Sequence, residues 1–380
     1  MKVIANRSAL SSALALAAKA APAGGARLIL TNVLLVADAA GSAEFEPTLS
    51  VYATNLTVAV RHTLRGVEVK AGGTTLVPAG KFRDIVKESD DDTLSLEVEG
   101  DQVVIQGHDS RFKLNTTGVE DFPPEPEVGK GGSIRVPFAE ALAVINKTRF
   151  AAGLIDKATA TEGVLFNVEK DKLQLVATDG RRMAISWMPA TSKKKANFVV
   201  PRLSLALVAS MPIPAPAPAE EGKEAEPALL TITWSDNRVV FEGGDTRISS
   251  VLVEGTFPPY EAVVPTEHRV KATLDRASFQ QSLKRAALFV SEASTAVKFE
   301  WTKAGVRMES VDPAEGEAGV SLACPVAGGD LTIGFQPSMI REGLEHAGAD
   351  EVSLEMTDPN RPGLLRGTDF LYVAMPMGLK

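Results

Sequence analysis

One pattern occurs three times along the chain, and each occurrence carries the same three markers in the same order. The first marker is an alternating apolar run that ends in a turn, at Leu49–Leu56, Leu173–Gly180 and Val306–Pro313. Alternation is typical of a half-buried strand, and Asn, Asp and Gly are residues that turns favour. A repeat of this length constrains the fold more than any single motif, because it requires tandem copies of one structural unit.

The second marker is a proline that opens a helix, at Pro78, Pro201 and Pro337. Proline suits a first helical turn, where its missing N–H is not needed. Apolar residues follow each proline at helical spacing. This marker therefore predicts one helix in the middle of each copy.

The third marker is a strand that follows an acidic turn. The three turns contain Asp109, Asp245 and Asp369. Each copy also opens with a helix, which Asn6 can cap in the first copy, Pro137 can start in the second and Asp275 can cap in the third. The repeat unit is thus two helices and several short strands.

Stretches rich in Pro and Gly at 123–132 and 258–265 separate the copies. The second copy is lengthened by a Pro/Ala/Glu insertion at 212–227, which we expect to be exposed to solvent. The predicted domains are residues 1–128, 129–262 and 263–380.

Composition narrows the class of protein. The net charge is −8, which argues against tight DNA binding through phosphate contacts. No apolar run is long enough for a membrane span or a signal peptide, and Cys324 is the single cysteine, so a cytoplasmic location is expected.

Catalytic and metal-binding motifs are missing from the sequence. The four histidines are scattered, and none has metal-ligand spacing with Cys324. The segment Gly129–Gly132 lacks the spacing of a phosphate-binding loop, and Asp90–Asp92 fits an acidic turn better than a cation site. We therefore expect no cofactor, no metal and no enzymatic activity.

Three segments carry a resemblance to a known family. Val176–Ala184 is similar to the central-domain motif of the bacterial sliding clamp, the β subunit of DNA polymerase III. Glu254–Tyr260 is similar to that family's domain-junction segment, and Tyr372–Met377 is similar to its C-terminal tail. Each segment stands in the expected copy, and the resemblance spans the whole chain.

The resemblance implies an α+β fold of three tandem DNA-clamp domains, each with two helices packed on antiparallel sheets. Two chains would join head to tail as a homodimeric ring that encircles double-stranded DNA without reading its sequence. Such a ring is a processivity factor that tethers polymerases. Because a ring holds DNA by topology, an acidic chain needs only a mildly positive inner surface.

The resemblance also implies three groups of site residues. Partners, namely the replicative polymerase subunit, the clamp loader and repair polymerases, would insert a short apolar peptide between domains two and three. The residues that match this cleft are Thr178, Gly180, Arg181, Arg182, Met183, Pro258, Val263, Val373, Met375, Pro376 and Met377. The basic residues expected to face DNA are Arg7, Lys19, Lys81, Arg83, Lys87, Lys147, Arg149, Arg202, Lys284, Arg285 and Arg341. The residues expected at the dimer interface are Arg111, Phe112, Leu114, Leu288, Phe289, Glu315 and Glu317.

The chain departs from the family pattern at two places. Lys157–Glu162 aligns where the family often has bulkier residues beside the cleft, so we expect one shallow wall there and expect Ala160→Tyr to be tolerated. Gly378 stands where a basic residue is common. Three alternatives stay open: an inhibitor-resistant second copy of the clamp, an enzyme that reuses the fold, and a scaffold ring that never encircles DNA. The sequence does not identify the partners or the role of the insertion.

Overall fold

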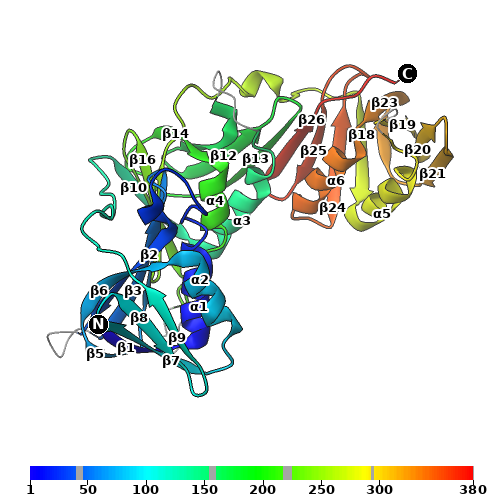
Figure 1. The fold of residues 1–380 in the computed structure, drawn as a ribbon. Helices are drawn as coiled ribbons and strands as arrows, with labels where there is room; N and C mark the ends of the chain where they lie inside the picture. The colour runs from blue at the N-terminus through cyan, green and yellow to red at the C-terminus, as the bar shows by residue number, and fades with distance from the viewer. Residues whose placement is uncertain (40–45, 154–159, 217–224, 292–294, 380) are drawn as a thin grey trace. The chain divides into compact units, whose positions relative to one another are not determined.

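The structure, a computed structural model, describes residues 1–39, 46–153, 160–216, 225–291 and 295–379 (Figure 1). Its compact units do not coincide with the sequence copies. Unit 1 contains residues 1–141 and 203–252, and unit 2 contains residues 142–202 and 253–380. The second copy therefore contributes to both units, and each unit is described by itself below.

Unit 1 contains two antiparallel sheets among its described residues. The five-stranded sheet has, in spatial order, β5 (Glu68–Ala71), β1 (Lys2–Asn6), β7 (Thr93–Glu99), β8 (Gln102–Gln106) and β9 (Arg111–Asn115). The eight-stranded sheet has β10 (Gly132–Pro137), β15 (Leu229–Trp234), β16 (Arg238–Gly243), β17 (Thr246–Val251), β4 (Val58–Leu64), β3 (Thr48–Thr54), β2 (Asn32–Asp38) and β6 (Gly73–Pro78).

Unit 2 is built in the same way from its described residues. The nine-stranded sheet has β14 (Ala196–Pro201), β11 (Gly163–Val168), β12 (Lys172–Thr178), β13 (Arg182–Pro189), β26 (Phe370–Ala374), β25 (Gly363–Gly367), β24 (Glu351–Met356), β18 (Val270–Asp275) and β22 (Val326–Gly328). The four-stranded sheet has β21 (Gly316–Leu322), β20 (Gly305–Asp312), β19 (Val297–Thr302) and β23 (Leu331–Phe335).

The helices follow the capping signals in the sequence. They are α1 (Arg7–Ala17), α2 (Ala79–Glu88), α3 (Phe138–Arg149), α4 (Arg202–Val208), α5 (Arg276–Ala286) and α6 (Pro337–His346). The side chain of Asn6 accepts a hydrogen bond from the amide of Ala9 at 3.0 Å, and Asp275 accepts one from Ser278 at 2.8 Å. Both predicted N-caps are confirmed. Over the described ranges, no helix is long and apolar enough to cross a membrane.

Apolar residues at helical spacing form the core beneath these helices. In unit 1, α1 packs on α2, with Leu14 and Phe82 fully buried; in unit 2, α5 packs on α6, with Leu283 and Leu344 buried. The predicted helix faces are therefore confirmed.

The prolines differ from the prediction in one respect. Pro337 is the first residue of α6, as expected. Pro78 and Pro201 instead end strands β6 and β14, and Pro137 ends β10. Each of these three prolines immediately precedes a helix, where the fixed φ of proline completes the strand before the chain turns.

Sheets continue from one sequence copy into the next. In unit 1, β17 of the second copy pairs with β4 of the first, with Ser250 opposite Val58. In unit 2, β26 of the third copy pairs with β13 of the second, with Ala374 opposite Arg182. In both cases the strand that contains the third marker of one copy pairs with a strand of the preceding copy. That partner is the strand immediately after the first marker. This is why compact units cross the copy boundaries.

Candidate functional site

The turn between β12 and β13 is built by the Thr178-Asp179-Gly180 sequence. The Thr178 hydroxyl donates to the carbonyl of Arg182 at 2.7 Å and accepts from the amide of Gly180 at 3.1 Å. One carboxylate oxygen of Asp179 accepts from the amides of Arg181 and Arg182 at 2.9 and 3.0 Å. Gly180 has φ of +84°, a left-handed conformation that favours glycine. The turn is therefore rigid before any ligand binds.

Strand β26 holds the C-terminal tail beside this turn. Met183 lies opposite Val373 in the β13–β26 ladder, and the amide of Met375 donates to the carbonyl of Arg181 at 2.9 Å. Met183 and Val373 are buried, whereas Met375 is 37% exposed. The tail thus adds an accessible methionine to a buried apolar floor.

The segment after Phe257 forms the facing wall. It includes the short helix η3 (Glu261–Val263). The Tyr260 hydroxyl donates to the side-chain oxygen of Gln174 at 3.1 Å, and the Tyr260 ring lies edge-on to Phe257. Burial raises the pKa of Tyr260, so the hydroxyl stays a neutral donor. Val263, at the end of the wall, is 48% exposed.

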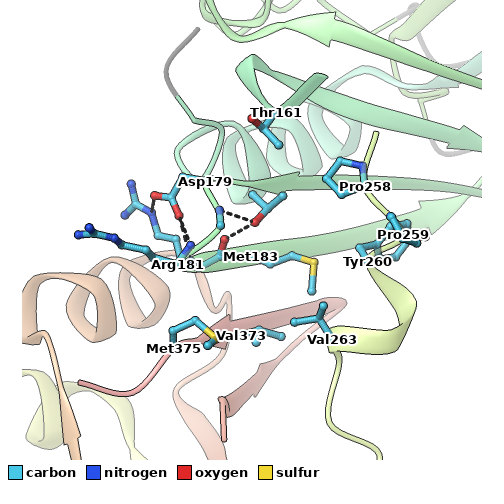
Figure 2. A pocket seen from close by; sticks show the side chains of 13 residues that line it. Thr161, Asp179, Arg181, Met183, Pro258, Pro259, Tyr260, Val263, Val373 and Met375 are labelled. Carbon is cyan, nitrogen blue, oxygen red and sulfur yellow. Dashed lines mark hydrogen bonds and ion pairs between the residues drawn. The ribbon is translucent and has the colours of Figure 1, made fainter. Parts of the chain in front are cut away.

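Together these elements enclose a cleft of about 310 Å³ within unit 2 (Figure 2). Its lining residues are Thr161, Thr178, Asp179, Gly180, Arg181, Arg182, Met183, Pro258, Pro259, Tyr260, Val263, Val373 and Met375. Figure 2 shows Met183 pointing into the space between Val373 and the linker residues. A concave, mostly apolar site with a few polar groups at its rim suits an apolar side chain held by a peptide.

The guanidinium of Arg182 is fixed from several sides. Its Nε donates to Asp179 Oδ2 at 2.9 Å, its Nη1 forms an ion pair with Glu342 of α6, and its Nη2 donates to the carbonyl of Phe150 at 3.3 Å. It also lies over the Phe150 ring, 5.6 Å from the centroid. The Phe150 ring stacks on His346 at 4.1 Å and on Tyr372 at 5.9 Å. Arg182 thus joins the cleft to the third copy.

The structure brings together nine of the eleven predicted cleft residues. Pro376 and Met377 do not line the cleft: the amide of Met377 donates to the carbonyl of Gly334 at 2.8 Å, which carries the tail toward β23. The sequence analysis missed Asp179, Pro259 and Tyr260, and it placed Thr161 beside the cleft only as part of the departing segment Lys157–Glu162. The available signal was the quoted motifs, since Val176–Ala184 contains Asp179 and Glu254–Tyr260 contains Pro259 and Tyr260.

The expectation for Ala160 is wrong. Ala160 is fully buried in the short helix η2 (Ala160–Glu162), among Leu165, Val176 and Met183. A tyrosine there would add a large side chain to a fully buried position, and overpacking destabilises a core. The remaining wall residue is Thr161; residues 157–159 lie outside the described residues.

Unit 1 contains a turn with the same hydrogen bonds. The Thr54 hydroxyl donates to Val58 at 2.9 Å and accepts from Leu56 at 3.0 Å, while Asn55 accepts from the amides of Thr57 and Val58 at 3.0 and 2.8 Å. Leu56 has φ of +75° where the other turn has Gly180. The β4–β17 junction therefore reproduces the backbone of the cleft.

Side chains fill the corresponding place in unit 1. Strand pairing shows that Tyr52 corresponds to Val176 of unit 2. It also shows that Leu30, in the short helix η1 (Leu28–Thr31), corresponds to Thr161. Leu30, Tyr52 and Phe122 form one buried cluster. Tyr52 also donates to the carbonyl of Pro124 at 3.1 Å.

The basic residues expected to face DNA lie on or beside the helices. Eight of them are exposed, namely Lys19, Lys81, Arg83, Lys87, Arg202, Lys284, Arg285 and Arg341. Arg7, Lys147 and Arg149 are half-buried. Lys147 donates to the carbonyl of Thr368 at 2.8 Å, and burial lowers its pKa. Lys147 therefore joins α3 to the turn before β26 and is less available to a ligand than the exposed eight.

The residues expected at the dimer interface lie on two edge strands and a helix end. β9 and β21 are edge strands of their sheets. Phe112 on β9 is 41% exposed, and Leu288, after α5, is 71% exposed. Leu114 and Phe289 are half-buried, and Glu315 and Glu317 are exposed. Arg111 pairs within its own chain with Glu99 at 3.3 Å.

Metal ligands do not gather in the described ranges, where no group of three or more His, Cys, Asp or Glu could hold an ion. The described cleft has an apolar floor, a rigid turn and two arginines at the rim, which suits recognition of a ligand with an apolar side chain.

Comparison with known proteins gives a consistent result. Family models match residues 1–126, 135–259 and 261–378, described as the N-terminal, central and C-terminal domains of the DNA polymerase III beta subunit. A beta sliding clamp from Vibrio cholerae is 31% identical over 92% of both chains. Solved structures of DNA polymerase III beta subunits from Pseudomonas aeruginosa and Thermotoga maritima, each 26% identical, cover all of both chains with TM-scores of 0.87 and 0.88. A sliding clamp from Pseudomonas aeruginosa bound to griselimycin is 27% identical, with a TM-score of 0.88 over the full length of both chains.

Proposed function

The chain belongs to the DNA polymerase III beta subunit family, and from this membership we propose how its own residues carry out the work of a sliding clamp. A sliding clamp is a non-catalytic processivity factor: it encircles duplex DNA and tethers polymerases to it. The proposal assigns three sites: a peptide cleft, a ring interface and a DNA-facing surface. It includes location at the nucleoid and the three clamp domains 1–128, 129–262 and 263–380.

We assign the cleft of unit 2 to short peptides of replication and repair proteins. The observation that carries this is an open apolar cavity whose rim is held by the hydrogen bonds of the Thr178–Arg182 turn. A leucine side chain buried there would contribute about 1.5–3 kcal/mol. Methionine at 183 and 375 suits several ligands, because its flexible thioether adapts to different shapes.

Calorimetry with a polymerase-derived peptide, carrying a glutamine and a leucine-rich end, tests the cleft. Removing Met375–Lys380 should abolish binding while the protein stays dimeric. Val263→Asp, on the exposed linker wall, should weaken binding without a change in stability, since Val263 is 48% exposed. Undiminished binding by both variants would place the peptide site elsewhere.

The ring interface follows from the pairing rule within the chain. Within the chain, β17 of the second copy pairs with β4 of the first, and β26 of the third copy pairs with β13 of the second. The equivalent strands that remain are β9 of the first copy and β21 of the third, and both are edge strands. The rule therefore pairs β9 of one chain with β21 of another. Phe112 corresponds to Ile248 and Tyr372, which are both fully buried in their own junctions. Its 41% exposure supports the proposal that a strand of another chain covers it.

The same rule predicts the register between the two chains. Phe112 corresponds to Ile248 and Tyr372, and Ala318 corresponds to their partners Val60 and Ala184. The same register therefore places Phe112 opposite Ala318. Lys113, rather than Arg111, then lies opposite Glu317. Opposite charges across a strand pair fix such a register.

Light scattering tests the ring, with about twice the chain mass of 40.2 kDa expected. Phe289→Lys should yield monomers because it buries an unpaired charge. Lys113→Glu and Glu317→Lys should each weaken the dimer, and the double exchange should restore it. A wild-type monomer at micromolar concentration would contradict the closed ring.

The DNA-facing surface is assigned to the exposed basic residues of the helices. Because the net charge is −8, binding to short linear duplex should be weak and lost at moderate salt. Protein loaded on a nicked circle should persist until the circle is cut. Equal retention on linear and circular DNA would rule out topological linkage.

A further inference from the structure

The ion pair between Arg182 and Glu342 links two parts of unit 2 that lie far apart in sequence. Arg182 begins β13 and lines the cleft. Glu342 lies in α6, outside the cleft lining. The Arg182 side chain is 17% exposed and the Glu342 side chain 36%, so the pair is partly shielded from water.

Each bond to the guanidinium has a separate anchor. Asp179 comes from the turn, Phe150 from the residue after α3, and Glu342 from α6. Only Glu342 among these belongs to the third sequence copy, which also supplies Val373 and Met375 to the cleft. The pair therefore ties the turn on one side of the cleft to the copy that supplies the other side.

We propose that Glu342 is a positioning residue for the peptide cleft, acting through Arg182. Held between Asp179 and Glu342, Arg182 keeps the turn in register with α6 and with the tail, so the cleft is formed before the peptide arrives. A preorganised site binds more tightly because less ordering remains to be done on binding. This inference rests on the proposed peptide-binding function.

Unit 1 shows what the same position does without the pair. Each junction joins successive copies, so the helix that corresponds to α6 beside the β3–β4 turn is α4. Helix alignment places Leu207 at the position of Glu342, and Val58 stands where β13 has Arg182. Leu207 and Val58 are both buried. Unit 1 thus has two apolar residues where unit 2 has the ion pair.

The test is a double-mutant cycle read out by calorimetry with the same polymerase-derived peptide. Glu342→Gln and Arg182→Gln should each lower affinity by about tenfold, within the usual range of coupling between sites. The double variant should lose no more than Arg182→Gln alone, because Glu342 acts through Arg182. Glu342→Asp, which keeps the charge, should recover part of the affinity.

Two control variants remove one negative charge each, as Glu342→Gln does, but at other positions. Glu345→Gln lies one turn closer to the end of α6 and removes the exposed pair with Arg341. Asp84→Asn removes an exposed carboxylate of α2, in unit 1. Both should bind peptide as the wild type does, and all variants should scatter light as dimers.

The outcomes separate this inference from the proposed function. Wild-type affinity in Glu342→Gln, or additive losses in the double variant, overturns the positioning role while the tail deletion still abolishes binding. Undiminished binding in the tail deletion overturns both the cleft assignment and the role of Glu342.

Discussion

The β12–β13 turn of unit 2 and the β3–β4 turn of unit 1 share one backbone and differ in what lies beside them. Both make the same hydrogen bonds, and both receive a neighbouring strand at the same register. Beside the first is an open cleft; beside the second, Leu30, Tyr52 and Phe122 are packed together. The repeat therefore gives both units the same backbone arrangement at this place. A few side chains decide whether that place is an open cleft or a packed core.

The linkers beside the two turns differ in the same sense. In unit 2 the linker presents Tyr260, which is half-buried against the cleft. In unit 1 the corresponding linker presents Glu125, which pairs with Arg61 at 3.0 Å and Arg247 at 2.7 Å. The unit 1 linker is held at this position by ion pairs with two arginines, whereas Tyr260 donates to the neutral side chain of Gln174 and lines the open cleft.

The largest expected effect comes from removing the aromatic ring that closes the unit 1 junction. Tyr52→Ala should lower the free energy of unfolding by about 3–5 kcal/mol, because Tyr52 is only 4% exposed and packs edge-on against Phe122. Tyr260→Ala, the matched change at the open junction, should cost less stability and reduce peptide affinity instead. Urea denaturation of both variants measures this; equal losses would break the comparison.

Filling the open cleft should have the next largest effect. Thr161→Leu puts into unit 2 the side chain that Leu30 supplies in unit 1, and it should lower peptide affinity about tenfold, or about 1.4 kcal/mol. Stability should change little, since Thr161 borders the open cavity. The isosteric Thr161→Val is the control and should bind normally. Unchanged affinity in Thr161→Leu would show that this wall does not meet the peptide.

A smaller effect is expected from the Tyr52 hydroxyl. Tyr52→Phe removes its hydrogen bond to Pro124 and should cost about 1 kcal/mol at neutral pH. Burial raises the pKa of Tyr52 to about 12, above the unfolded value near 10. The stabilisation from the neutral hydroxyl is complete below pH 10 and is lost as pH rises through 12.

The stability difference between wild type and Tyr52→Phe should therefore shrink from pH 9 to pH 12. Urea denaturation at several pH values, with both proteins in parallel, gives this difference. Buried Tyr372 titrates in both proteins and cancels. If the stability difference between the two proteins did not change with pH, Tyr52 would have the same pKa in the folded and the unfolded state.

The smallest effect concerns the wall of the cleft. Tyr260→Phe removes the bond to Gln174 and should weaken peptide binding about two- to threefold, or roughly 0.5 kcal/mol, because a partly solvated neutral hydrogen bond contributes little. Gln174→Ala should produce the same change, and combining the two should add nothing further. Additive losses would show that Tyr260 touches the peptide directly.

Local chemistry made much of this architecture predictable from sequence. The Thr-Asp-Gly turn, the Asn6 and Asp275 caps and the alternating strands depend on neighbours within a few residues, and each has the predicted form. The resemblance supplied most of the cleft lining, because matching motifs place residues on matching strands.

What could not be predicted depends on contacts between distant segments. Tyr52 and Val176 occupy the same place in their strands, yet only the folded linker shows that the tyrosine reaches Pro124. Ala160 was expected at a surface and is buried, since it belongs to an apolar cluster formed by residues from distant strands. Met377 was assigned to the cleft because the C-terminal tail resembles that of the family, but its backbone bridges to Gly334.

The mismatch between sequence copies and compact units has a consequence for how such a chain can be recombined. The segment that was duplicated is not the segment that folds, because each unit contains half of the second copy. A chimaera that exchanged one whole copy with a distant relative would replace one side of a backbone ladder, at β4–β17 or β13–β26, and leave the other side unmatched. Crossovers near residues 142, 202 and 253 would instead keep each ladder within one parent. Homologous exchange that preserves function should therefore be found inside the second copy more often than at its borders.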